Sequence, residues 1–324
     1  MRTAFFATVV MAGAAQADTP VLTVLAPDYF GSSWGPGPAI TEGFEARCDC
    51  TLDFRTGEVL PRLMLEGARV GADAVIGLNT DMTLRARETG LFAPHGQDLG
   101  ALTVPVEWDD DIFIPFNWGY AAWVYDKTRV ENPPASFAEL IEREDLSLIW
   151  QDPRSSGSGL ALLLWVDHLY GEDAGEVWQA LQENTVTVTA SWSEAYGLFT
   201  AGEADMVLSY TTSPAYHIVA EEDDSKAAAI FDEGHYFMAE VAGVLDGAAE
   251  PELARDFMAY ILSEDFQSMI AYGNWSYPSA LPREDWPEVM RDLAFPKTAI
   301  FLDEVAADAA RGPALERWLE GMTR

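Results

Sequence analysis

Apolar and polar positions along the first third of the chain alternate between the periods of a strand and of a helix. Short apolar or β-branched runs predict strands at residues 21–25, 51–54 and 74–78. Apolar residues at helical spacing predict helices between them, at 39–47 and 59–66. Strands that alternate with helices in this way predict an α/β lobe with a largely parallel sheet.

The alternation continues after a long strand-like stretch. Residues Ile112 to Tyr125 are rich in Phe, Trp, Tyr and Val and are predicted to leave the first lobe for a second one. Ser136 is predicted to cap a helix, with Glu139 as its capping-box partner. The pattern then predicts strands at 148–151, 186–189, 206–210 and 237–245, and helices at 157–170, 193–201, 251–270 and 302–319.

The two predicted lobes fit the length of 324 residues, which suffices for two separate cores. We assign residues 18–117 together with 237–285 to the first lobe. The second lobe takes 118–236 together with 286–324. Because the chain crosses between the lobes more than once, a cleft is expected at the crossing, and such clefts are favoured ligand sites.

The N-terminal 17 residues have the pattern of a signal peptide. Arg2 provides a positive start, Ala4 to Ala14 are largely apolar, and Ala15-Gln16-Ala17 matches a cleavage site. The alternative is a short buried element of the fold. We expect a mature chain that begins near Asp18 and is released into the periplasm, since the sequence has no second apolar span and no cysteine at the cleavage site for a lipid anchor.

The two cysteines agree with export. Cys48 and Cys50 are too few to form a structural zinc site alone. In an oxidising compartment a disulfide between them is favoured, and free thiols are the alternative.

The formal net charge of −34 excludes a nucleic-acid partner, because phosphates would be repelled. Most of this charge is expected to serve solubility. Its field also favours cationic ligands, although salt screens it beyond about 10 Å.

Signatures of catalysis or metal binding are weak. The sequence contains no phosphate-binding loop of the Gly-x-x-x-x-Gly-Lys type. None of its four histidines has the spacing of a metal site, and each is expected to be structural or exposed. We therefore predict no catalytic residue, no metal and no cofactor.

Aromatic residues are the informative feature, with eleven tryptophans in the chain. Trp165 lies among aliphatic residues and is predicted to be core. Six other aromatic residues lie beside, or two positions from, Gly, Pro, Ser or Thr, as loop residues at a ligand cleft do: Trp34, Trp118, Trp192, Tyr210, Tyr216 and Trp275. An aromatic cleft in an acidic protein suits a flat, cationic ligand.

Several long segments carry a family resemblance. They are Trp34-Gly-Pro-Gly-Pro38, Tyr125-Asp-Lys127, Gln151-Asp-Pro-Arg154, Gly159 to Trp165, Thr185-Val-Thr-Val-Thr189, Trp192 to Phe199, Leu208 to His217 and Gly273-Asn-Trp-Ser-Tyr-Pro278. In these segments the sequence resembles the periplasmic thiamine-binding proteins of bacterial importers, over essentially the whole mature chain.

The resemblance implies a two-lobed periplasmic-binding-protein fold of type II, with the ligand in the cleft between the lobes. It implies a monomer that captures thiamine, thiamine monophosphate or thiamine diphosphate for the membrane permease of an ABC importer. The implied contacts are aromatic at Trp192, Tyr210, Tyr216 and Trp275, and polar at Ser156, Thr211, Thr212 and Ser213. Trp34 is a further candidate contact because of its loop surroundings.

The sequence departs from the family at three places. Gly157 stands where the family has Thr, which would remove a hydroxyl donor. Pro27 replaces a Tyr after the first strand, and Tyr29 is the candidate substitute. An acidic segment of the family is shortened to Thr56-Gly57-Glu58, and Glu58 is the acid that could face the ligand.

Three alternatives share the fold. Thiaminase I resembles it and cleaves thiamine with a cysteine nucleophile, but both cysteines here lie in a segment that matches the non-enzymatic relatives. Ferric-binding relatives need adjacent tyrosine ligands, which Ser209-Tyr210-Thr211 does not supply. A polyamine binder would need several cleft acids along a linear ligand.

Overall fold

The computed structural model describes residues 19–32 and 35–323. The predicted signal peptide and Trp34 lie outside this range. The strands are β1 (Val21–Ala26), β2 (Thr51–Thr56), β3 (Ala74–Asn79), β4 (Phe92–Ala93), β5 (Ile114–Asp126), β6 (Leu148–Gln151), β7 (Thr185–Thr189), β8 (Met206–Tyr210), β9 (Lys226–Ala228), β10 (His235–Leu245), β11 (Tyr277–Pro278) and β12 (Ala299–Ile300).

Helices separate most of these strands. They are α1 (Gly37–Glu45), α2 (Val59–Glu66), α3 (Thr83–Glu88), α4 (Phe137–Glu142), α5 (Gly157–Tyr170), α6 (Ala174–Glu183), α7 (Trp192–Thr200), α8 (Ser213–Ala220), α9 (Pro251–Ile261), α10 (Glu264–Gly273), α11 (Glu288–Asp292) and α12 (Glu304–Thr323). The short 3-10 turn η3 (Thr80–Met82) links β3 to α3.

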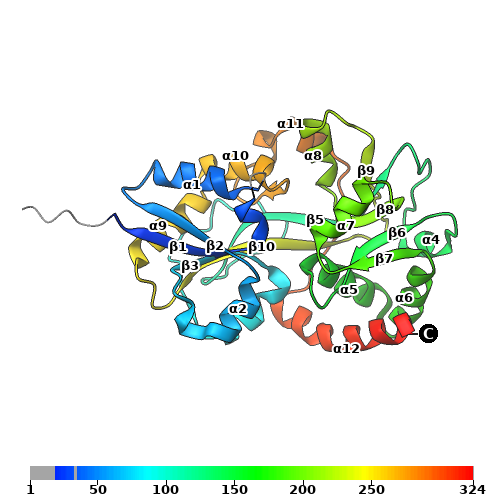
Figure 1. The fold of residues 1–324 in the computed structure, drawn as a ribbon, viewed down its shortest axis with the longest axis horizontal. Coiled ribbons are helices and arrows are strands. Elements are labelled where there is room, and N and C mark those ends of the chain that lie inside the picture. Colours follow the sequence, from blue (N-terminus) through cyan, green and yellow to red (C-terminus); the bar gives the residue numbers. More distant parts are fainter. Residues whose placement is uncertain (1–18, 33–34, 324) are drawn as a thin grey trace, which may run out of the picture.

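Two long strands, β5 and β10, join the two halves of the molecule (Figure 1). The main path of the sheet runs β2-β1-β3-β10-β5-β8-β6-β7. Pairing is parallel within each half, between β1 and its neighbours β2 and β3 and between β6 and its neighbours β7 and β8. The strands β5 and β10 pair antiparallel with each other in the middle. The predicted α/β architecture of two lobes with crossing strands is therefore present.

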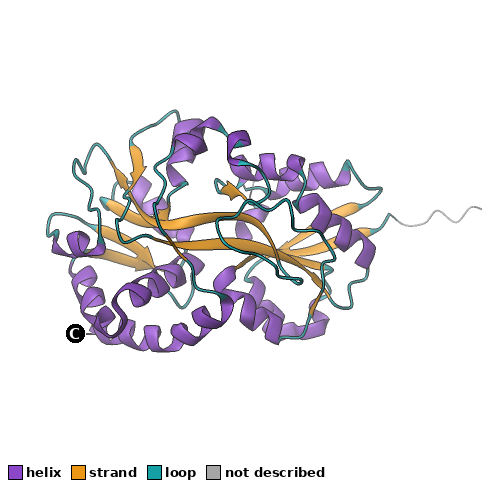
Figure 2. Cartoon of the chain, turned by 180° about the vertical axis from the view of Figure 1, so that it is seen from behind, coloured by secondary structure: helices purple, strands orange, loops and turns teal. Residues whose placement is uncertain are grey.

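Each half has its own apolar core. In the first, Phe44 and Phe257 pack edge to face between α1 and α9. In the second, Trp150 and Trp178 pack together, and Trp165 is fully buried, as its aliphatic surroundings predict. Figure 2 shows helices on both sides of the long strands, so the sheet is covered on both faces.

The predicted single helix over 251–270 is wrong. The structure has two helices, α9 and α10, which are separated at Leu262 and Ser263. The Ser263 hydroxyl accepts a hydrogen bond from the Phe266 amide at 3.4 Å and so caps α10. The apolar spacing continues through this break, which is why the pattern alone suggests one helix.

The last helix, α12, is continuous although Pro313 lies inside it. It packs against α5 and α6 of the second half and also against η3 and α3 of the first half.

The predicted lobe boundary at residue 286 stays a prediction. Trp286 stacks on Tyr277, with ring centroids 4.7 Å apart, next to the crossing strands. Among the described residues, no helix has the length and apolar character that a membrane crossing requires.

The favoured disulfide between Cys48 and Cys50 is formed. Because it links residues only two positions apart, it restricts the unfolded chain little. We expect the paired Cys48→Ser and Cys50→Ser substitutions to lower the free energy of unfolding by about 1.5 kcal/mol or less. Thermal melts of the variant and the parent protein, followed by circular dichroism, measure this. Failure of the variant to fold would show that the bond contributes more than loop closure.

Candidate functional site

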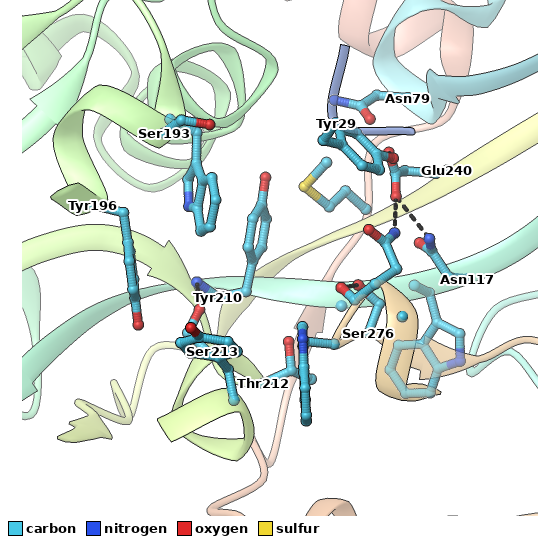
Figure 3. A pocket seen from close by; sticks show the side chains of 18 of the residues that line it. Tyr29, Asn79, Asn117, Ser193, Tyr196, Tyr210, Thr212, Ser213, Glu240 and Ser276 are labelled. Atoms are coloured by element: carbon cyan, nitrogen blue, oxygen red, sulfur yellow. Dashed lines mark hydrogen bonds between the residues drawn. The ribbon is translucent and has the colours of Figure 1, made fainter. Parts of the chain in front are cut away.

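A cavity of about 490 Å³ lies between the two halves, which is a volume typical of small-molecule sites. Tyr29 and Asn79 line it from the first half. Trp192 and Tyr210 line it from the second half, and Glu240 lines it from the crossing strand β10. Figure 3 shows the labelled side chains around one space, with Tyr196 and Tyr210 across from Tyr29 and Glu240.

One aromatic wall is built at the start of α7. The Ser191 hydroxyl caps this helix by accepting from the Glu194 amide at 3.3 Å, which places Trp192 in the first turn. The Trp192 ring stacks on Tyr196, with centroids 4.9 Å apart and planes 23° apart. Its indole Nε1 donates to the Ser209 hydroxyl at 2.9 Å. Stacking and hydrogen bond together hold a flat apolar face at the cavity.

A second aromatic pair comes from α8 and the end of α10. Tyr216 and Trp275 pack edge to face, with centroids 5.5 Å apart. The backbone of Trp275 has φ of 50°, which is uncommon for a residue other than glycine. Such a conformation costs about 1–2 kcal/mol, and surrounding contacts must maintain it. Strained backbone of this kind is typical of functional sites, and here the strained residue, Trp275, lines the cavity.

Tyr210 stands at the end of β8 and lines the cavity. Burial raises the pKa of its hydroxyl, and the negative charges of Glu240 and Asp81 raise that pKa further. The hydroxyl therefore stays protonated and can donate a hydrogen bond to a ligand.

Glu240 is the polar centre of the opposite wall. Its carboxylate accepts hydrogen bonds from the amide groups of Asn117 and Asn274, both at 2.7 Å, and from the Tyr29 hydroxyl. The pKa of the Glu240 carboxyl is raised above its ordinary value by burial, and these three donors offset that rise only in part by bonding to the charged form. The donors fix the orientation of an acid that faces an apolar cavity (Figure 3).

Residues 72–302 match the family model for bacterial extracellular solute-binding proteins. The chain belongs to this family. It is 46% identical to the thiamine-binding periplasmic protein of Escherichia coli (strain K12), with 94% of each chain covered. It is 42% identical to the protein of the same name from Brucella abortus, covering 98% of this chain and 97% of that one.

A solved structure described as a periplasmic thiamin binding protein superposes on the solute-binding protein with a TM-score of 0.91. Its sequence is 45% identical, and the match covers 96% of this chain and 98% of that one. The fold is therefore the type II periplasmic-binding-protein fold that the sequence predicts, and the protein is periplasmic. In this solute-binding protein the cavity between the lobes is the candidate ligand site.

The cavity brings together six of the residues predicted to contact ligand. They are Trp192, Tyr210, Thr212, Ser213, Tyr216 and Trp275. Trp118, which the sequence singled out as a cleft aromatic without assigning it a ligand contact, also lines the cavity. Thr211 is buried behind the wall instead, with only 1% of its surface exposed.

Two predicted residues lie at the start of α5, outside the cavity lining. Ser156 is the residue before the helix, and its hydroxyl lies 2.9 Å from that of Ser158. A Cβ atom at Gly157 would approach the Asn79 amide nitrogen to 2.4 Å. Asn79 does line the cavity, and its side chain occupies the space that a threonine at 157 would need.

The predicted wall at Thr56, Gly57 and Glu58 lies at the junction of β2 and α2 and does not line the cavity. Thr56 and Glu58 are exposed there. Of the two candidates after the first strand, Tyr29 is the residue in the cavity wall. The carboxylate on this side is thus Glu240 and not Glu58.

Sequence reasoning missed Glu240, Asn117, Asn274 and Tyr196. For Glu240 a signal exists, because it is the one acid within the otherwise apolar strand β10. A lone acid in a buried strand indicates a paired or functional carboxylate. The two asparagines and Tyr196 have no comparable signal in the sequence.

A second buried carboxyl group lies close to the cavity, in η3. Asp81 is only 4% exposed, and neither of its side-chain oxygens has a hydrogen-bond partner among the described residues. Burial raises the pKa of Asp81 to about 7, although the charge of Arg311 on α12 lowers it in part. At neutral pH this group is therefore between its charged and neutral forms.

Proposed function

We propose that this protein captures thiamine in the cavity between its lobes and delivers it to the membrane permease of an ABC importer. The observation that carries the proposal is the cavity itself. Stacked aromatic rings at Trp192 and Tyr196 face an oriented, partly buried carboxylate at Glu240. The names of the relatives at 42–46% identity support the same ligand.

The chemistry of thiamine matches this arrangement. Its thiazolium ring is a permanent flat cation, and its aminopyrimidine ring is flat and carries hydrogen-bonding groups. A cation over an aromatic face is worth about 0.5–2 kcal/mol, and ring stacking about 0.5–1.5 kcal/mol. Several such contacts, with a carboxylate and hydroxyl donors, can together give submicromolar affinity.

A non-enzymatic role is supported by the position of the cysteines. Cys48 and Cys50 are joined in a disulfide and pack against the core of the first lobe, away from the cavity lining. A cysteine nucleophile of the thiaminase type would have to be a free thiol at the ligand. We propose that the bound molecule is released unchanged.

Metal capture is less well supported. Within the described residues, His217, Glu221 and Asp223 form a group with the spacing of metal ligands. The two ring nitrogens of His217 already bond to Tyr196 and Glu221, at 2.8 and 2.6 Å. Asp223 bonds to Ser225 and Lys226. These partners favour a structural role for the three side chains.

The test is a calorimetric titration of the purified protein with thiamine. We expect one site per chain and a dissociation constant below one micromolar. Thiochrome, a neutral, fused-ring oxidation product of thiamine, is the matched control and should bind far more weakly because it lacks the cationic charge. If thiamine gives no binding heat at several temperatures, the proposal fails. Release of free thiazole on incubation with a nucleophile would instead indicate an enzyme.

A further inference from the structure

His217 links two residues of the cavity wall from behind. Only 1% of its surface is exposed, and it does not line the cavity. Its Nε2 atom lies 2.8 Å from the hydroxyl oxygen of Tyr196, and its Nδ1 atom lies 2.6 Å from a carboxylate oxygen of Glu221. Tyr196 and Glu221 both line the cavity. The three side chains therefore form one hydrogen-bonded chain that begins and ends at the wall.

The partners of the imidazole fix which of its atoms carries a proton. An ionised carboxylate only accepts hydrogen bonds, so the His217 Nδ1 atom donates to Glu221. In the neutral ring, Nε2 then has a free lone pair and accepts from the Tyr196 hydroxyl. Glu221 thus sets the direction of the bond at Tyr196 without being part of it.

His217 also contacts both aromatic pairs of the cavity wall. The Tyr196 ring stacks on Trp192 and on His217, at interplanar angles of 23° and 24°. Tyr216 meets the His217 ring edge to face, with centroids 5.2 Å apart, and packs in the same way on Trp275. All four of these aromatic residues line the cavity. The position of one buried imidazole therefore affects four rings at the ligand site.

Helix stability does not explain the place of Glu221. It follows α8 directly, at the end of the helix where the dipole disfavours a negative charge. Its side chain is 44% exposed and yet returns along one helical turn to His217. The lysine that follows in the chain, Lys226, pairs with Asp126 and Asp223 and does not offset the charge. Orienting His217 is a role that accounts for this position.

We propose that His217 and Glu221 are positioning residues for the ligand site. Glu221 orients the imidazole, the imidazole holds the Tyr196 hydroxyl, and the Tyr196 ring fixes the face of Trp192 against which a flat ligand lies. This inference rests on the proposed function and adds residues that act on the ligand through others. Rings that are held in place before binding lose little freedom when the ligand arrives, so the affinity is higher.

The first experiment is a calorimetric titration of the Glu221→Gln protein with thiamine. Glutamine keeps the size of the side chain but removes the charge that strengthens the bond to His217. Thiamine is expected to bind about five- to tenfold more weakly. The melting temperature should change little, because Glu221 is exposed. Glu222→Gln is the matched control, since it removes the same charge from the next residue, which is also exposed, and should leave the affinity unchanged.

A double substitution tests whether Glu221 acts through Tyr196. Because Glu221 lines the cavity, its charge could also attract a cationic ligand directly. Tyr196→Phe keeps the stacked ring, removes the hydroxyl and is expected to weaken binding by a similar factor. If the two residues act in one chain, adding Glu221→Gln to Tyr196→Phe weakens binding by less than about twofold more. A direct attraction would give the full loss from Glu221→Gln in both backgrounds.

The imidazole signals give a readout that a change in stability does not move. The sequence has four histidines, so their ring nitrogens can be resolved by nitrogen-15 NMR, and His217→Gln identifies the signal of His217. The neutral ring is expected to carry its proton on Nδ1 in the parent protein. Glu221→Gln should raise the fraction with the proton on Nε2, because glutamine can donate to Nδ1 as well as accept from it. Glu222→Gln should leave this fraction unchanged.

The outcomes separate this inference from the proposed function. If the parent protein gives no binding heat with thiamine, both fail. If the parent protein binds thiamine and Glu221→Gln binds it equally well, the positioning role alone is overturned. The role is also overturned by equal losses from Glu221→Gln in both backgrounds, or by equal losses in Glu221→Gln and Glu222→Gln. A neutral His217 ring with its proton on Nε2 in the parent protein overturns the proposed direction of the bonds.

Discussion

Replacing Trp192 with alanine is expected to weaken thiamine binding at least tenfold while leaving the fold intact. The substitution removes the flat face that stacks on Tyr196 and lines the cavity. The lost cation–π and stacking contacts are together worth about 1.5–3 kcal/mol, which corresponds to roughly ten- to hundredfold in the dissociation constant. Because Trp192 is only half-buried at the start of α7, little core packing is lost.

The measurement is a pair of titrations and a pair of thermal melts, on the variant and on the parent protein. Trp192→Phe is the control, because it keeps an aromatic face on Tyr196 and loses only the indole hydrogen bond to Ser209. We expect it to retain most of the affinity. Equal affinity in Trp192→Ala and the parent protein would show that the ligand lies elsewhere.

Asp81→Asn is expected to stabilise the protein above neutral pH. Burial holds the pKa of the Asp81 carboxyl at about 7 in the folded chain, whereas an aspartate in the unfolded chain titrates near 4. Between about pH 4 and pH 7 the folded state therefore binds more protons than the unfolded state. Stability that depends on this group is complete at low pH and falls as pH rises through the window.

Asparagine resembles the protonated carboxyl group and does not titrate. The variant should therefore keep the stability that the parent protein loses as pH rises. At pH 8 the gain could reach about 4 kcal/mol, from roughly three pKa units at 1.36 kcal/mol each. Arg311 reduces the gain, because removal of Asp81 leaves its partly buried guanidinium with Asp308 as the remaining opposing charge. The net effect is expected to be a higher melting temperature at pH 8 and little change at pH 4.

Urea unfolding of the variant and the parent protein between pH 4 and pH 8 measures the difference. Asp256→Asn, which changes an exposed aspartate on α9, is the matched control and should show no such pH dependence. A difference between Asp81→Asn and the parent protein that stays constant with pH would mean that Asp81 does not titrate in this window.

Apolar periodicity and capping residues predicted helices whose ends are set by residues close in sequence. The helices α2 and α5 have the bounds that periodicity predicts, and the Ser136 hydroxyl caps α4 by accepting from the Glu139 amide at 3.0 Å. The same approach failed across Ser263, where a capping hydroxyl interrupts an apolar period that continues on both sides. Periodicity reports which face is buried and does not report where the backbone turns.

The sequence likewise identified some residues of the candidate site and missed others. The aromatic residues beside glycine or serine could be identified from their neighbours, and Trp192, Tyr210 and Trp275 do line the cavity. The acid at the site was missed because acids occur throughout the chain, although Glu240 is the one acid within strand β10. The sequence favoured Glu58, whereas the cavity contains Glu240.

The sequence by itself determined the α/β class, the aromatic character of the site and, through its family segments, the expected ligand. These properties follow from residue type and from order along one segment. Only the tertiary structure decided which acid faces the ligand. Antiparallel pairing of β10 with β5 sets Glu240 opposite Asn117, and the end of α10 adds Asn274. Those residues are far apart in sequence, so no local pattern connects them.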